Sequence, residues 1–127
     1  MKFLTPHQHA QLIANGKAQA PVKGTGREID FHPVVRLFNP YGAGTWLLTE
    51  IDADDPDIAW GLADLNCGCA EIGAISLSEL SALRHPYGFF LIERDQHWSP
   101  RAPISAYIKA SVAAGRIVEP DLEPVSN

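Results

Sequence analysis

The chain has 127 residues and a formal net charge of −5, and 46% of its residues are hydrophobic against 20% charged. These proportions are typical of a globular protein and exclude a disordered or fibrous one, and the length predicts one domain whose core needs no disulfides. The lysines and arginines are scattered singly, which argues against a basic surface for nucleic acid.

The single domain, residues 1–127, is expected to have three parts. Residues 1–30 form a helix and a connection, residues 31–118 form a core of sheet and helices, and residues 119–127 form a polar tail. No window resembles a signal peptide or a membrane-spanning helix, and the two cysteines do not make a disulfide framework. We therefore expect a cytoplasmic protein with free thiols and no membrane partner.

A first helix begins at Thr5, which can cap it, and has Pro6 in its first turn, where a missing N–H costs little. The pair Asn15-Gly16 is predicted to end this helix, because glycine readily adopts positive φ. Four apolar segments separated by short turns are then predicted to be strands, at 34–38, 45–52, 58–65 and 70–75. Connections this short favour antiparallel neighbours.

A second helix follows, starting with a capping box in which Ser76 and Glu79 satisfy free N–H groups. His85-Pro86 stops it, because the residue before proline is pushed out of the helical region. Residues 89–92 are apolar on both faces and are predicted to begin a fifth, central strand. A last helix starts near Ile104 and ends at Gly115.

Residues 116–118 can add a short edge strand after the last helix. Together these elements predict an α+β fold, in which an antiparallel sheet of about five strands carries two or three packed helices.

Several blocks of the core, in a fixed order, resemble one family of bacterial proteins, known as domain of unknown function 2958. The blocks are Pro33–Pro40, Thr45–Asp52, Gly61–Leu65, Glu71–Gly73, Ser76–Leu80 and Ile92–Asp95. The resemblance covers residues 28–118 and implies an association with plasmids and other mobile elements. It implies no activity, cofactor or catalytic residue, and the paired cysteines of 67–69 depart from the family pattern.

Two acidic strand ends are the candidate sites. Glu93, Asp95 and His97 alternate along one face of the predicted fifth strand, where carboxylates and an imidazole can bind a metal or move a proton. The alternative is that this polar end is simply solvated. Trp98, which follows, either packs on the core or forms one wall of a binding cleft.

Glu50 and Asp52 repeat the pattern at the end of the second strand, on the face predicted to carry Trp46 and Leu48. If the second and fifth strands ran parallel as neighbours, the two acidic ends would meet and form a site. If they ran antiparallel, these ends would lie at opposite edges, as ordinary solvated strand ends.

Cys67 and Cys69 would make half of a structural zinc site, which His32, His85 or His97 could complete. Zinc usually takes four ligands from two spaced pairs, however, and a second pair is missing. We predict idle or buried thiols, no metal and no cofactor. The leading functional hypothesis is a small binding or accessory module, associated with a mobile element, whose partner is a protein or a small molecule. The alternative is a metal-dependent or acid–base hydrolase that uses the acidic strand ends.

Overall fold

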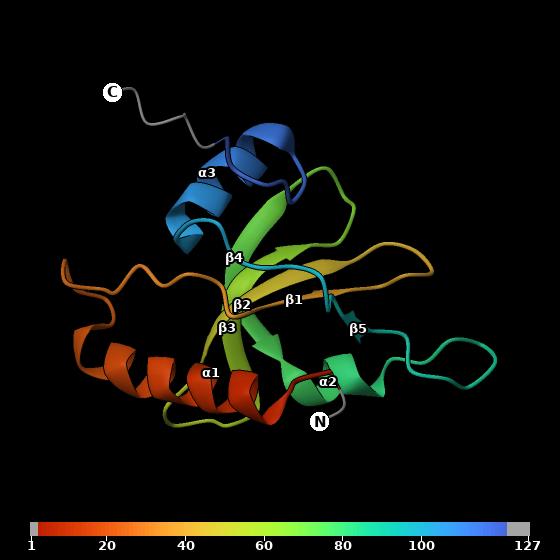
Figure 1. The fold of residues 1–127 in the computed structure, drawn as a ribbon, viewed down its shortest axis with the longest axis horizontal. Coiled ribbons are helices and arrows are strands. Elements are labelled where there is room, and N and C mark those ends of the chain that lie inside the picture. Colours follow the sequence, from red (N-terminus) through yellow and green to blue (C-terminus); the bar gives the residue numbers. More distant parts are fainter. Residues whose placement is uncertain (1–2, 122–127) are drawn as a thin grey trace.

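The computed structural model describes residues 3–121, so residues 1–2 and the last part of the predicted tail, 122–127, lie outside it (Figure 1). The elements in chain order are α1 (Pro6–Gln19), the short 3-10 helix η1 (Ala20–Val22), β1 (Val35–Phe38), β2 (Thr45–Ile51), β3 (Ile58–Asp64), β4 (Ala70–Ser76), α2 (Leu77–Ala82), β5 (Glu93–Arg94) and α3 (Ile104–Ala114). The strands form one sheet in the order β4-β3-β2-β1-β5, and every neighbouring pair is antiparallel. The predicted α+β fold is confirmed.

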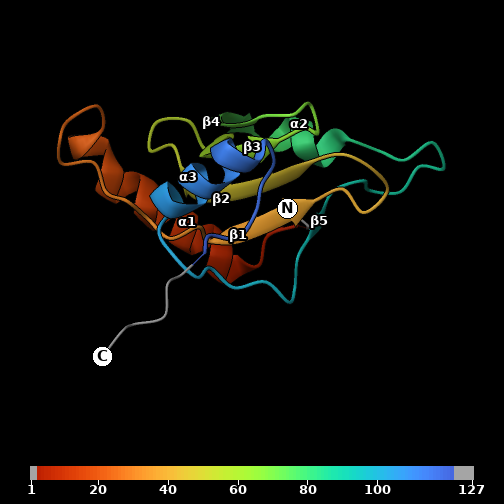
Figure 2. The same ribbon diagram turned by 90° about the horizontal axis from the view of Figure 1, so that it is seen from above.

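The two faces of the sheet carry separate apolar clusters. Helices α1 and α2 lie on one side and α3 on the other, as Figures 1 and 2 show together. The cluster under α1 and α2 contains Phe3, Leu4, Leu12, Val35, Leu37, Trp46, Leu48, Ile51, Ala59, Ile75, Leu77, Leu80 and Ile92. The smaller cluster under α3 contains Leu47, Leu62, Ala70, Ala102, Ile104 and Tyr107. Strand β2 therefore contributes to both clusters, because successive side chains of a strand point to opposite faces of the sheet.

Helix α1 begins as predicted but does not end at Gly16. Thr5 Oγ1 accepts a hydrogen bond from Gln8 N (3.0 Å) and Thr5 N donates to Gln8 Oε1 (3.1 Å), a complete capping box. The helix runs on to Gln19, with Gly16 in its interior. A Cβ atom at Gly16 would lie 1.6 Å from the carbonyl oxygen of Ile51, so glycine is needed here for the close approach of α1 to β2 and not for termination.

The predicted cap of α2 is confirmed at Ser76, whose Oγ accepts a hydrogen bond from Glu79 N (3.2 Å). The reciprocal bond from the Glu79 side chain is absent among the described residues. Instead Asp57, in the turn before β3, accepts hydrogen bonds from Ser76 Oγ (2.8 Å) and from Ser78 N (2.8 Å). These hydrogen bonds lower the pKa of Asp57, and the bond from the Ser76 hydroxyl has the largest effect.

The prediction of the fifth strand was wrong about the residue at which it begins and about its place in the sheet. Strand β5 spans only Glu93–Arg94 and lies at the edge of the sheet beside β1. The apolar residues before it belong to a loop, in which Phe89 is 41% exposed and stacks on His85, with ring centroids 4.4 Å apart. These rings pack on one another outside the core. An apolar run in the sequence looks the same whether its side chains are buried or stack on one another at the surface. Residues 116–118 form no strand either; Ile117 N instead donates to Asp64 Oδ2 (3.0 Å).

Candidate binding cavity

A β-bulge decides which side chains of β2 reach the α3 side of the sheet. Leu48 pairs with Gly61, but the next pair is Glu50 with Trp60, so Thr49 is an extra residue in the strand. The Thr49 hydroxyl donates to the carbonyl oxygen of Trp60 (3.1 Å), which holds the bulge. A bulge re-aims the residues that follow it.

Glu50 therefore lies on the opposite face from the one predicted. Trp46 and Leu48 belong to the cluster under α1 and α2, whereas Glu50 lines a cavity together with Ile104 of α3. The prediction that Glu50 and Asp52 share the face of Trp46 and Leu48 was wrong, because the strict alternation on which it rested is broken at Thr49.

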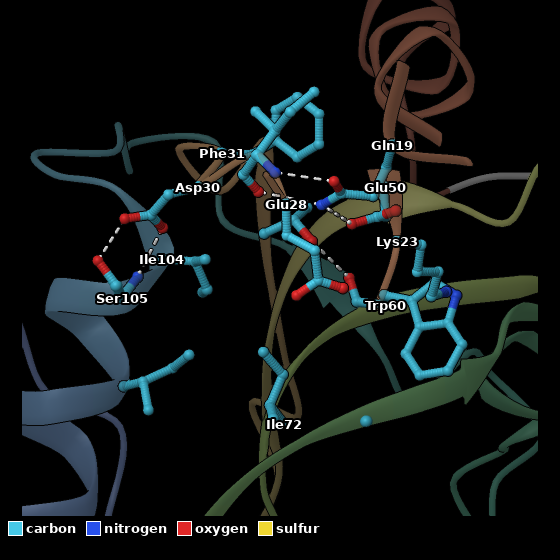
Figure 3. A pocket seen from close by; sticks show the side chains of 14 residues that line it. Gln19, Lys23, Glu28, Asp30, Phe31, Glu50, Trp60, Ile72, Ile104 and Ser105 are labelled. Carbon is cyan, nitrogen blue, oxygen red and sulfur yellow. Dashed lines mark hydrogen bonds between the residues drawn. The ribbon is translucent and has the colours of Figure 1, made fainter. Parts of the chain in front are cut away.

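The cavity, which we call the Glu50 cavity, has a volume of about 560 Å³ and lies between the sheet, the first turns of α3 and the segment 23–31 (Figure 3). Its walls combine aromatic and aliphatic side chains with a few polar groups. It is lined by Gln19, Lys23, Glu28, Ile29, Asp30, Phe31, Thr49, Glu50, Trp60, Ile72, Gly73, Ile104, Ser105 and Ile108. A concave, largely apolar site with few polar groups is the usual form of a small-molecule site.

Glu50 is the buried carboxyl of this cavity, with only 7% of its surface exposed. Its burial raises its pKa above the usual 4.5, and the hydrogen bond from Gln19 and the charge of Lys23 only partly oppose this. Gln19 Nε2 lies 3.4 Å from Glu50 Oε1 and is fixed by Ile29, whose N donates to Gln19 Oε1 (2.8 Å). Glu50 Oε2 has no hydrogen-bond partner within the described part of the chain.

Lys23 and Asp52 lie beside Glu50. Lys23 Nζ is 3.5 Å from the centroid of the Trp60 ring and 3.8 Å from Asp52 Oδ2. Asp52 also accepts from the N–H of Asp54 (2.8 Å) and from Trp60 Nε1 (3.3 Å), and these bonds lower its pKa. Asp52 is therefore paired with Lys23 and does not line the Glu50 cavity, whereas Glu50 does.

The second acidic strand end lies elsewhere. Strands β2 and β5 run in the same direction, but β1 stands between them. Glu93 lines a different cavity, of about 330 Å³. Asp95 Oδ2 accepts from Arg36 Nη1 (3.0 Å), and Asp95 Oδ1 accepts from His97 N (3.0 Å). The structure therefore does not bring Glu93, Asp95 and His97 to Glu50.

Trp98 lies at a third place. Its Nε1 donates to Glu119 Oε2 (3.1 Å), and its ring centroid is 6.1 Å from that of Tyr107. It lines a cavity of about 480 Å³ that also contacts His7 and His32. Trp98 therefore does wall a cavity, but this cavity is separate from the Glu50 cavity.

Sequence reasoning missed three residues of the Glu50 cavity. Lys23 and Gln19 fell in or beside a segment without periodicity, which was interpreted as a surface connection. Trp60 lies in the segment 58–65 that is predicted to be a strand, which does not by itself place its ring on the Glu50 cavity. The only signal in the sequence was Thr49-Glu50, two adjacent polar residues inside an apolar strand, which is where a bulge can lie.

The fold and the cavity define a small α+β domain with one closed sheet face and one face that is partly open. A family model described as "Protein of unknown function (DUF2958)" matches residues 3–118, and the chain belongs to this family. No curated protein and no solved structure matches the chain. None of the described helices is long and apolar enough to cross a membrane, and residues 3–121 contain no group of three histidine, cysteine or acidic side chains placed to hold a metal ion.

Proposed function

We propose that the protein is a binding module whose Glu50 cavity takes a small ligand with an apolar body and a cationic amino group. The observation that carries the proposal is Glu50 itself. Its side chain is 7% exposed and burial raises its pKa, so the charged form of this carboxyl is costly in the free protein. A cationic donor in the cavity would remove that cost.

The shape and lining of the cavity support an apolar body for the ligand. Ile72 is 56% exposed on the sheet surface, and Ile104 and Ile108 of α3 line the same cavity. The Trp60 ring already carries one cation, Lys23, on its face. Covering these side chains would remove apolar surface from water, which favours binding.

The charges of the cavity favour a cation over an anion. Glu28, Asp30 and Glu50 face a single lysine, Lys23. Glu28 Oε1 accepts from Gly24 N (2.7 Å), and both Asp30 oxygens accept from Ser105. Among the described residues, Glu50 is therefore the one of these three carboxylates that accepts no hydrogen bond from the backbone.

The test uses tryptamine, which joins an indole ring to a primary ammonium group, and the matched neutral alcohol tryptophol. Calorimetric titration should show tryptamine binding at least about tenfold more tightly than tryptophol, and Glu50→Gln should remove that difference. Glu93→Gln, at the other acidic strand end, is the control variant and should bind as the native protein does. Equal affinities for the two probes, or binding of neither, would contradict the proposal.

An acid–base hydrolase is the second candidate, and one observation favours it, because a carboxyl with a raised pKa suits a general acid. It would use Glu50 and not the set of Glu93, Asp95 and His97. Hydrolysis of 4-nitrophenyl acetate that is lost in Glu50→Gln but kept in Glu93→Gln would favour it over the binding module. Association with mobile elements and residence in the cytoplasm remain predictions from the sequence.

A further inference from the structure

The turn between β3 and β4 holds two cysteines on an unusual backbone. Asn66 has φ 64° and Gly68 has φ 85°, both in the left-handed region. These two residues curl the chain so that Cys67 Sγ and Cys69 Sγ lie 3.1 Å apart, although only one residue separates them. Both cysteines are free and exposed, so the part of the prediction that they are buried was wrong.

We propose that Cys67 and Cys69 are a redox site, a dithiol that is reversibly converted to an intramolecular disulfide by exchange with small disulfides such as oxidised glutathione. The two sulfurs need to approach by about 1 Å to reach the bonded distance of about 2.05 Å. Both side chains are exposed, so neither is held away from the other by a surrounding core. Exposed disulfides are the ones that exchange readily with small thiols. This site is independent of the Glu50 cavity.

The local charges assign different roles to the two thiols. The hydrogen bond with Cys67 is the main cause that raises the pKa of Cys69 to about 11, and the carboxylates of Glu71 and Asp64 act in the same direction. Cys69 therefore keeps its proton and can donate it to Cys67 Sγ, so that Cys67 supplies the attacking thiolate.

The exchange balances with one molecule of oxidised glutathione. The Cys67 thiolate attacks one glutathione sulfur, the glutathione disulfide breaks, and the first glutathione leaves as a thiolate that takes up a proton. Cys69 then loses its proton and attacks Cys67 Sγ, which expels the second glutathione. The protein has lost two protons and two electrons, and two reduced glutathione molecules have formed.

A structural zinc site fits the turn less well than a disulfide. Zinc takes four ligands, and no third histidine, cysteine or acidic side chain completes a metal site with the pair within residues 3–121. The carboxylate nearest to Cys69 Sγ, Glu71 Oε1, is 3.9 Å away and is placed to accept a hydrogen bond. The short separation of the sulfurs is instead the geometry that precedes a sulfur–sulfur bond.

The test equilibrates the full chain with mixtures of reduced and oxidised glutathione, blocks the remaining thiols with a maleimide and measures the intact mass. We expect both thiols to be lost together, without an attached glutathione, and to return when dithiothreitol is added. In Cys69→Ser the second step is absent, so Cys67 should instead accumulate as a mixed disulfide with glutathione. Cys67→Ser also lacks the second thiol and loses the neighbour that mainly raises the pKa of Cys69, so Cys69 should likewise stop at a mixed disulfide with glutathione.

Three results would overturn the proposal. These are glutathione on both cysteines of the native chain, a disulfide between two chains at low protein concentration, and no loss of thiols at any ratio of the glutathione mixture. Thermal melts of the two serine variants, whose replaced side chains are exposed, should coincide with the melt of the reduced native protein, which separates a change of reactivity from a change of fold.

Discussion

The two faces of the sheet differ in how completely they are covered. Under α1 and α2 a single apolar cluster runs along the sheet from Phe3 to Ile92, and α1 approaches β2 so closely that Gly16 meets the carbonyl oxygen of Ile51. On the other face α3 covers a smaller cluster around Leu47 and Tyr107. Beyond the first turns of α3, the sheet lines the Glu50 cavity.

This difference teaches how stability and binding are divided in a small domain. The closed face buries the larger apolar cluster, which is the main source of stability, and its buried Asn15 donates to the carbonyl oxygen of Thr49. The open face accepts a buried carboxyl with a raised pKa, which lowers stability and makes a site. Substitutions on the two faces should therefore differ in sign as well as in size.

The largest effect is expected where the closed face is tightest. Gly16→Ala places a Cβ atom 1.6 Å from a backbone oxygen, so α1 must move away from β2. We expect a loss of about 3 kcal/mol in the free energy of unfolding, at the upper end for overpacked sites. Urea denaturation followed by circular dichroism measures it.

The matched control is Gly73→Ala in β4, where an added Cβ would meet nothing within 4 Å. Glycine weakens a strand through its entropy, so this change should leave stability unchanged or raise it by up to about 1 kcal/mol. Equal losses for the two variants would show that glycine flexibility, and not the contact with Ile51, governs both positions.

A smaller effect of opposite sign is expected on the open face. Burial raises the pKa of Glu50, so the native state binds this proton more tightly than the unfolded chain does. Its favourable contribution is fully present below the unfolded pKa of about 4.5 and is lost as the pH rises through the raised native pKa. Glu50→Gln should therefore melt at a higher temperature than the native protein at pH 8, with little difference at pH 4.

Differential scanning calorimetry at both pH values checks this expectation. Glu93→Gln, on the exposed β5, is its control and should shift the melting temperature equally little at pH 4 and pH 8. A Glu50→Gln protein that is less stable than the native protein at pH 8 would mean that the Gln19 and Lys23 contacts outweigh the cost of burial.

The smallest effect is expected at the sheet edge, outside both faces. Asp95→Asn removes the ion pair with Arg36, whose two side chains are 25% and 29% exposed. We expect a loss of about 0.5 kcal/mol in the free energy of unfolding, which should shrink in 1 M salt because salt screens partly exposed pairs. Urea denaturation at low and high salt measures this change, and a loss that is larger in high salt would rule out the ion pair as its cause.

The first four strands and the caps at Thr5 and Ser76 could be predicted because turn residues and capping residues act locally. The predictions were wrong where one local sequence pattern is compatible with two different structures. Glycine at position 16 can end a helix or allow close packing, and only the presence of β2 decides between them. The apolar run 89–92 is split between two environments, because Ile92 is buried in the cluster under α1 and α2 whereas Phe89 stacks its ring on His85 at the surface.

The candidate site was harder to predict than the fold. The sequence predicts that Glu50 and Asp52 lie on one face of the strand because they are two residues apart. The face on which each side chain lies depends, however, on the register between β2 and β3. Lys23 reaches Trp60 from a segment without any pattern. Such contacts between distant, irregular segments leave no periodic trace in a sequence.

The extra residue at Thr49 also bears on how this family could diversify. A one-residue insertion in a strand normally reverses every side chain after it, but here Ile51 still pairs with Ala59 and still reaches the closed face. A chain without Thr49 would pair Glu50 with Trp60 and Ile51 with Ala59 in regular alternation, and would therefore keep both the fold and the carboxyl. The length of β2 at this one place can then vary in the family without moving the charge out of the cavity.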